Sequence, residues 1–225
     1  MHAPLPTRIV ESGEDPQFAV IWLHGLGADG ADFAGIVPEL GLAASPGVRF
    51  IFPDAPSIPV TCNGGYVMPA WYDIIALDST SRRIDEAGIV ASCAAIRDLI
   101  ARENARGIPC QNIFLAGFSQ GGAVAYTTAL THPAPLAGII ALSTYIPSPG
   151  LLTAAVTPRH LDLPIFAAHG TQDDVVAPTL GKQARDFLQA HGYRVDWHEY
   201  RMPHTVCLEE IQAIGDWLKG RLAAA

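Results

Sequence analysis

Charge is scarce in this sequence, and positively charged lysine is the scarcest kind. Only 16% of the 225 residues are charged, two of them are lysines, and the formal net charge is −8. No basic run interleaved with aromatic residues occurs. A negative protein gains no electrostatic attraction to phosphate backbones or anionic membranes. We therefore expect no nucleic acid among its partners.

Long apolar runs and paired cysteines are also missing. The first sixteen residues hold no apolar stretch suited to a secretory signal. No segment approaches the about 18 uninterrupted apolar residues that indicate a membrane-spanning helix. The four cysteines lie far apart without CxxC spacing, which argues against a zinc site or a redox motif. We therefore expect a cytoplasmic protein with reduced thiols and no transmembrane segment.

Hydrophobic residues are abundant, at 49% of the sequence. A chain of this length can bury roughly 70% of its unfolded surface, so residues 1–225 are predicted to form one domain. Runs that are apolar throughout, such as FAVIWL and GIIALS, indicate strands of a parallel sheet covered on both faces. They alternate with helical patterns, which predicts a three-layer α/β fold with a mostly parallel sheet.

The pattern predicts individual elements as well. We expect the first two strands, joined by SGEDPQ, to form an antiparallel hairpin at one edge of the sheet. The predicted strands are Arg8–Glu11, Phe18–Leu23, Arg49–Phe52, Asn112–Ala116, Leu136–Leu142, Pro164–Ala168 and Arg194–Tyr200. The predicted helices are Asp32–Leu42, Ile84–Arg106, Gly121–Thr131, Thr179–His191 and Val206–Leu222.

One motif carries chemistry on its own. The residues GFSQG, at 117–121, follow an apolar strand and open a run of small residues. A serine between two glycines at a strand–helix joint is the pattern of a nucleophile elbow. Glycine fits at both flanking positions because a Cβ would clash with the turning backbone. The motif predicts Ser119 as a nucleophile and the backbone N–H of Gln120 as a donor to a bound oxyanion.

A serine nucleophile needs a base to take its proton and an acid to orient that base. In proteins with a nucleophile elbow, these partners follow the serine along the chain in the order acid, then histidine. Asp173 and Asp174 lie in a loop after an apolar strand, and His204 lies in the loop before the last helix. His198 shares the polar face of its strand, which is typical of a surface residue. The other histidines precede the acids, close a helix or lie at the N-terminus. We predict His204 as the base, with both aspartates open as its partner.

The segment GLGADG, at 25–30, admits two interpretations. It satisfies GxGxxG after a strand, and Asp54 lies 24 residues beyond the last glycine, as in a dinucleotide site. Alternatively, the turn supplies the N–H of Leu26 as the second oxyanion donor opposite Ser119. The second interpretation unites four segments in one site, so we favour it. We expect His24 to be a buried histidine that braces the turn.

Seven motifs together resemble a known family. They are LHGLGADG, FPDAP, NGGYVMPAWYDI, GFSQGGA, LSTYIP, HGTQDDVV and MPHTVC. In this order they resemble the carboxylesterase/acyl-protein thioesterase/lysophospholipase family of small α/β-hydrolases, with LHGLGADG and LSTYIP closer to the bacterial carboxylesterases. The family's catalytic aspartate stands four residues after the histidine of its loop, which here is Asp173. Asp174 departs from the family, where proline is frequent at that position.

The resemblance implies an α/β-hydrolase fold without a cap domain and an open site. It implies a serine carboxylesterase that hydrolyses small to medium acyl esters through an acyl-enzyme, without metal or cofactor. The partner is then a small-molecule ester. Met68, Trp71 and Tyr72 are expected to offer apolar surface to the acyl chain, although the aromatic residues could equally anchor a long loop to the core.

Alternatives from other classes stay open at this point. Thioesterase or lysophospholipase activity would use the same site. A dinucleotide-dependent reductase would rest on GLGADG, but Tyr145 has no lysine near it in the sequence to form the usual pair. A non-catalytic binding protein on a hydrolase fold is the third. The sequence does not indicate an oligomeric state, and a homodimer stays open.

Overall fold

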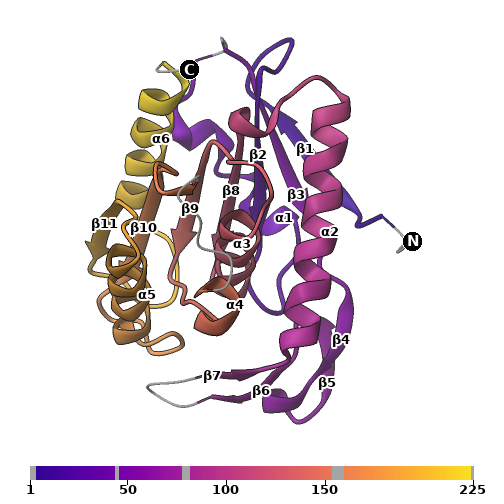
Figure 1. Ribbon diagram of the computed structural model, residues 1–225, viewed down its shortest axis with the longest axis vertical. Coiled ribbons are helices and arrows are strands. Elements are labelled where there is room, and N and C mark those ends of the chain that lie inside the picture. The colour runs from indigo at the N-terminus through magenta and orange to yellow at the C-terminus, as the bar shows by residue number, and fades with distance from the viewer. Residues whose placement is uncertain (1–3, 44–45, 78–81, 154–159, 224–225) are drawn as a thin grey trace.

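A seven-stranded sheet forms the centre of the molecule (Figure 1). The computed structural model describes residues 4–43, 46–77, 82–153 and 160–223. Along the sheet the strands are β1 (Thr7–Glu11), β3 (Val48–Pro53), β2 (Phe18–Leu23), β8 (Ile113–Phe118), β9 (Gly138–Leu142), β10 (Ile165–Gly170) and β11 (Val195–Tyr200). All but β1 run parallel to their neighbours. The mostly parallel sheet is as predicted, and each predicted strand is present within two residues of its expected ends.

The predicted hairpin of the first two strands is wrong. β1 is antiparallel and lies at the edge as expected, but it pairs with β3, from Thr7 opposite Pro53 to Glu11 opposite Arg49. Strand β2 already has parallel partners on both sides, β3 and β8, so no edge of it is free. An ion pair between Glu11 and Arg49 adds to the β1–β3 pairing.

Helices cover both faces of the sheet, which explains the unbroken apolar strands. In β2, Ala19, Ile21 and Leu23 belong to one core, whereas Phe18, Val20 and Trp22 belong to the other. The first core is closed by α2 (Glu86–Ala105), α3 (Gln120–Leu130), α4 (Pro149–Thr153) and α5 (Pro178–Ala190). The second is closed by α1 (Ala31–Ala34), the 3₁₀ helix η1 (Val37–Leu40) and α6 (Leu208–Leu222). Among the described residues, no helix is long and apolar enough to cross a membrane.

Two segments differ from the predicted elements. The expected helix Asp32–Leu42 is split into α1 and η1, because Pro38 has no N–H to continue a helix and starts the first turn of η1 instead. The Pro/Gly-rich stretch after β3 holds two hairpins that the sequence did not predict. They are β4 (Ser57–Val60) with β5 (Tyr66–Pro69), and β6 (Ile74–Leu77) with β7 (Arg82–Ile84). Two further 3₁₀ turns are η2 (Thr61–Asn63) and η3 (Cys110–Asn112).

The topology brings distant loops together at one edge. Parallel strands end at the same edge of a sheet, and open α/β sheets bind their ligands there. The loops after β2, β8, β10 and β11 therefore meet at the carboxyl edge, and the two hairpins lie beyond that same edge (Figure 1).

Candidate active site

Ser119 lies at the joint of β8 and α3 in a strained conformation. Its φ of 54° and ψ of −120° fall in a region that residues other than glycine rarely adopt. Two hydrogen bonds hold the backbone in place: the Ser119 N–H donates to the carbonyl of Leu142 at 2.9 Å, and the Thr144 hydroxyl donates to the carbonyl of Ser119 at 2.6 Å. The end of β9 and the loop after it, which holds Thr144, thus constrain the strained turn from both of its backbone polar groups.

The glycines on either side of the elbow permit close packing. A Cβ at Gly117 would lie 2.4 Å from the carbonyl carbon of Gly121, and a Cβ at Gly121 would lie 2.3 Å from the carbonyl oxygen of Leu23. No real Cβ tolerates such distances. The start of α3 therefore packs directly on the backbone of β8 and on the end of β2.

His204 and Asp173 form a hydrogen-bonded pair. His204 Nδ1 donates to Asp173 Oδ2 at 2.7 Å, and the His204 side chain is 14% exposed. The other oxygen, Asp173 Oδ1, accepts from the N–H groups of Val175 and Val176 at 3.0 and 2.8 Å. Asp174 is exposed on the surface. Of the two candidate aspartates, the structure brings Asp173 to the histidine, and its bond to Nδ1 leaves Nε2 of His204 to act as a base.

A second histidine supports the acid, and the sequence analysis assigned it no role. His169, at the end of β10, is buried; its Nε2 donates to the Val176 carbonyl at 2.8 Å and lies 3.4 Å from Asp173 Oδ2. Burial raises the pKa of Asp173, but the contacts with His169 and His204 and the Val176 N–H outweigh it and hold that pKa well below its usual range. The available signal was a histidine at the end of a buried strand, four residues before the acid.

The loops that carry Asp173 and His204 are hydrogen-bonded to each other. The N–H groups of Thr171 and Gln172 donate to the carbonyls of Tyr200 and Met202, at 2.8 and 3.1 Å. A Cβ at Gly170 would lie 2.4 Å from the Met202 carbonyl oxygen, so the two loops touch through backbone alone. This contact sets the register in which the acid faces the base.

The turn after β2 packs against the elbow. A Cβ at Gly25 would lie 3.5 Å from the Cβ of Ser119, and Gly27 has a φ of +78°. His24 braces the turn as expected: its Nδ1 donates to the Gly25 carbonyl at 2.7 Å, and its Nε2 accepts from the Ala55 N–H at 3.0 Å. Burial lowers the pKa of His24, which keeps the ring neutral and suits this pair of bonds.

Asp54, the residue that could have marked a ribose site, is engaged within the protein. Its Oδ1 accepts from the N–H of Gly30 at 2.7 Å. A Cβ at Gly30 would lie 2.4 Å from the carbonyl oxygen of Phe52, so this glycine serves packing between the turn and β3. The GxGxxG spacing is thus accounted for by the fold of the turn.

A cleft of about 220 Å³ joins the predicted residues. Ser119, His204, Leu26 and Gln120 all line it. The lining also includes Ala28, Asp32 and Gly25, together with the apolar or aromatic side chains of Ile74, Leu77, Phe118, Tyr145, Val175 and Val176. Three segments far apart in the sequence, which hold Leu26, Ser119 with Gln120, and His204, therefore contribute to a single cleft, as the sequence analysis expected for these four residues.

The residues expected to form the acyl wall lie elsewhere. Trp71 and Tyr72 are 2% and 0% exposed and belong to the core, and neither they nor Met68 line the cleft. The expectation is corrected in favour of its alternative, because both aromatic residues anchor the loop that follows β5. The apolar surface comes instead from Leu77 on β6 and Val175 after β10, which are 48% and 53% exposed.

No metal site accompanies this arrangement in the described part of the chain, where no group of three or more His, Cys, Asp or Glu side chains could hold an ion. The chemistry available from the residues at the cleft is that of a hydroxyl, an imidazole paired with a carboxylate, and backbone N–H groups. These are the components of acyl transfer to a serine.

Comparison with known proteins gives a consistent family. A profile of the Phospholipase/Carboxylesterase family matches residues 6–221. Acyl-protein thioesterase 1 of Neurospora crassa is 45% identical over 212 residues, covering 90% of this chain and 86% of its own. A protein of Oryza sativa subsp. japonica named "Probable carboxylesterase" is 35% identical over 213 residues, covering 92% and 78%. The crystal structure of Zea mays acyl-protein thioesterase 2 superposes with a TM-score of 0.85 at 27% identity, covering 96% of this chain and 99% of its own.

These relatives leave no basis for the reductase and the non-catalytic alternatives. The chain belongs to the phospholipase/carboxylesterase family and is a hydrolase with the α/β-hydrolase fold.

Proposed function

We propose that the protein hydrolyses acyl esters through a covalent acyl-enzyme on Ser119, with His204 as the base and Asp173 as its partner. The observation that carries the proposal is the His204–Asp173 hydrogen bond of 2.7 Å, from a half-buried histidine to a buried carboxylate, beside a cleft that also contains the strained serine. Strain at a functional side chain persists only where the surroundings impose it. The bonds of Leu142 at the end of β9 and of Thr144 in the next loop to Ser119 supply that constraint.

In the proposed reaction, the Ser119 hydroxyl attacks the acyl carbonyl as His204 Nε2 takes its proton. The imidazolium is stabilised by Asp173, whose depressed pKa keeps it ionised. His204 then gives the proton to the leaving group, and the acyl-enzyme forms. Water, activated by the same imidazole, attacks the acyl-enzyme and releases the acid and the free serine.

The oxyanion that forms during each attack is proposed to accept hydrogen bonds from the N–H groups of Leu26 and Gln120. Both residues line the cleft, and Gln120 opens α3, where the helix terminus favours negative charge. One such donor is worth about 3 kcal/mol of barrier lowering in enzymes of this chemistry.

The apolar lining favours a hydrocarbon acyl group over a charged one. Ile74, Leu77 and Val175 would contact it, and the small volume of about 220 Å³ supports small to medium chains. The thioesterase names of several relatives favour acyl thioesters as a second candidate, since the same attack on a carbonyl serves both. A cytoplasmic location stays a prediction from the sequence, and a homodimer stays open.

A substrate panel tests the proposal. Purified protein is assayed with p-nitrophenyl esters of two to sixteen acyl carbons, with the matching acyl thioesters, and with lysophospholipids, before and after labelling by a fluorophosphonate. We expect turnover of short and medium oxygen esters, lost on labelling. Thioester turnover at a higher kcat/KM would establish the second candidate, and the absence of any turnover would refute the proposal.

A further inference from the structure

The segment Pro69–Tyr72 lies between the two loops that carry the proposed oxyanion donors. On one side it holds the turn after β2: the Gly27 N–H donates to the Pro69 carbonyl at 2.8 Å, and the indole N–H of Trp71 donates to the His24 carbonyl at 2.9 Å. The rings of Trp71 and His24 also pack together, with centroids 5.2 Å apart. Leu26 stands between these two attachment points.

On its other side the same segment holds the elbow. The side chain of Gln120 is 1% exposed; its Oε1 accepts from the Trp71 N–H at 2.8 Å, and its Nε2 donates to the Tyr72 carbonyl at 2.7 Å. Gln120 thus has two separable parts. Its side chain binds the segment, whereas its backbone N–H is the proposed donor to the oxyanion.

Trp71 makes three hydrogen bonds, each to a residue from a different part of the fold. Its N–H meets Gln120, its indole N–H meets His24, and its carbonyl accepts from the hydroxyl of Ser92 on α2, which is buried. The neighbouring Ala70 N–H donates to the Pro56 carbonyl at 3.0 Å. Trp71 is 2% exposed and does not line the cleft of Ser119; it lines a separate hollow of about 400 Å³ between β4 and α2.

We propose that Trp71 is a positioning residue of the oxyanion site, whose indole N–H fixes the turn of Leu26 relative to the elbow of Gln120. Oxyanion donors act only when they are held at the place where charge develops, and small displacements cost large factors in rate. The inference rests on the proposed function, because it assumes that the two N–H groups serve an oxyanion. It gives the aromatic residue a role in kcat and none in binding the acyl group.

The substitution Trp71→Phe tests this role, because it removes the indole N–H and keeps an aromatic ring. We expect kcat to fall about ten- to a hundred-fold, with KM unchanged and with the same loss for short and medium acyl esters. Inhibition by phenylboronic acid, whose serine adduct mimics the tetrahedral intermediate, should weaken by a similar factor. Trp22→Phe is the matched control: Trp22 is 1% exposed, lies in the core on the other face of the sheet, and its indole N–H has no partner among the described residues.

The outcomes separate the inference from the proposed function. If the wild-type protein neither turns over esters nor reacts with a fluorophosphonate, the proposed function fails. If the wild type is active and folded Trp71→Phe retains kcat within two-fold, or loses activity through a KM that rises with acyl length, the positioning role is refuted. Thermal unfolding shows whether the variant is folded. Should it not fold, Gln120→Met, which removes the two side-chain bonds and keeps the backbone N–H, is judged by the same criteria.

Discussion

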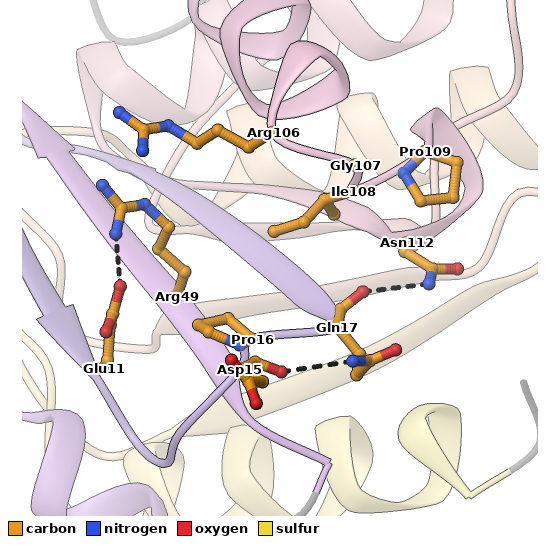
Figure 2. Close-up of a pocket in the computed structure, with 10 residues that line it drawn as sticks. All are labelled: Glu11, Asp15, Pro16, Gln17, Arg49, Arg106, Gly107, Ile108, Pro109 and Asn112. Atoms are coloured by element: carbon orange, nitrogen blue, oxygen red, sulfur yellow. Dashed lines mark hydrogen bonds and ion pairs between the residues drawn. The ribbon is translucent and has the colours of Figure 1, made fainter.

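Polar residues are arranged differently at the two edges of the sheet. At the amino edge, a hollow of about 460 Å³ is lined by charged side chains, among them Glu11, Arg49 and Arg106 (Figure 2). Arg49 pairs with Glu11, and both arginines pair with the buried Glu103, so the charges neutralise one another. At the carboxyl edge, the cleft has about half that volume and holds the strained serine.

The difference shows what distinguishes the proposed active site from a larger hollow. Beside the cleft, polar contacts link His169 to Asp173 and Asp173 to His204, which lines the cleft, and the bond to Nδ1 leaves Nε2 as the His204 ring nitrogen not bonded to Asp173. In the amino-edge hollow, the remaining bonds, such as those of Gln17 with Asp15 and Asn112, tie loops together (Figure 2). Convergent strain and hydrogen bonding, rather than size, mark the site.

The largest effect is expected at the elbow. Ser119→Ala removes the nucleophile, and enzymes of this chemistry lose about 10⁶-fold in kcat on such a change. Steady-state kinetics on a short-chain p-nitrophenyl ester measures the loss, and circular dichroism and thermal unfolding check the fold. Arg106→Ala, at the opposite edge, should change kcat/KM less than two-fold. Comparable losses in the two variants would erase the contrast between the edges.

The next effect separates the two aspartates. Asp173→Asn leaves His204 without a carboxylate to set its tautomer, and a loss of about 10⁴-fold in kcat is expected from the best-known triad. Asp174→Asn should stay within a few-fold, because its side chain is exposed. Kinetics of both variants at one pH gives the comparison, and the reverse ranking would transfer the role to Asp174.

At the amino edge, we expect the substitution with the largest effect to lower stability and to leave activity unchanged. The carboxylate of Glu103 is 7% exposed and lies 3.4 and 3.3 Å from nitrogens of Arg49 and Arg106. Glu103→Gln removes one charge partner from Arg49, which keeps Glu11, and one from the exposed Arg106, and should lower the free energy of unfolding by about 2 kcal/mol. Urea denaturation measures this loss, and kcat/KM of the folded variant should equal that of the wild type. A loss of activity without a loss of stability would contradict the division between the edges.

A further effect, on the pH dependence of stability, concerns a buried carboxyl next to the loop of His204. Burial raises the pKa of Glu210, at the start of α6, to about 8 from an ordinary value of 4.5. The folded protein then holds a proton that the unfolded chain has released, so this contribution to stability is complete below about pH 4.5 and is lost as the pH rises through 8.

Glu210→Gln removes that titration. The variant should therefore gain stability relative to the wild type between pH 5 and pH 9, by up to a few kcal/mol. Thermal unfolding of the variant and the wild type at pH 5 and at pH 9 measures how their difference in stability changes with pH. Glu209→Gln, on the exposed side of the same turn, should show an equal difference at both pH values. If Glu210→Gln behaves in the same way, the carboxyl is ionised in the folded state.

Much of this arrangement could be predicted from the sequence, because local pattern determines it. Unbroken apolar strands indicate a parallel sheet, and parallel strands send the loops of Ser119, Asp173 and His204 to one edge. Strand order is not local, and so the pairing of β1 with β3 was missed. The burial of Trp71 was likewise beyond the pattern, since an aromatic residue in a loop can face the core or the solvent equally well.

The most direct measurement is the capture of the acyl-enzyme. Protein mixed with an excess of a slowly hydrolysed p-nitrophenyl ester is quenched in acid within seconds, digested, and mapped by mass spectrometry. The account predicts an acyl adduct on the peptide that contains Ser119, formed in wild-type protein and absent from Ser119→Ala. Turnover of the ester with no adduct, or with an adduct on another residue that persists in Ser119→Ala, would contradict it.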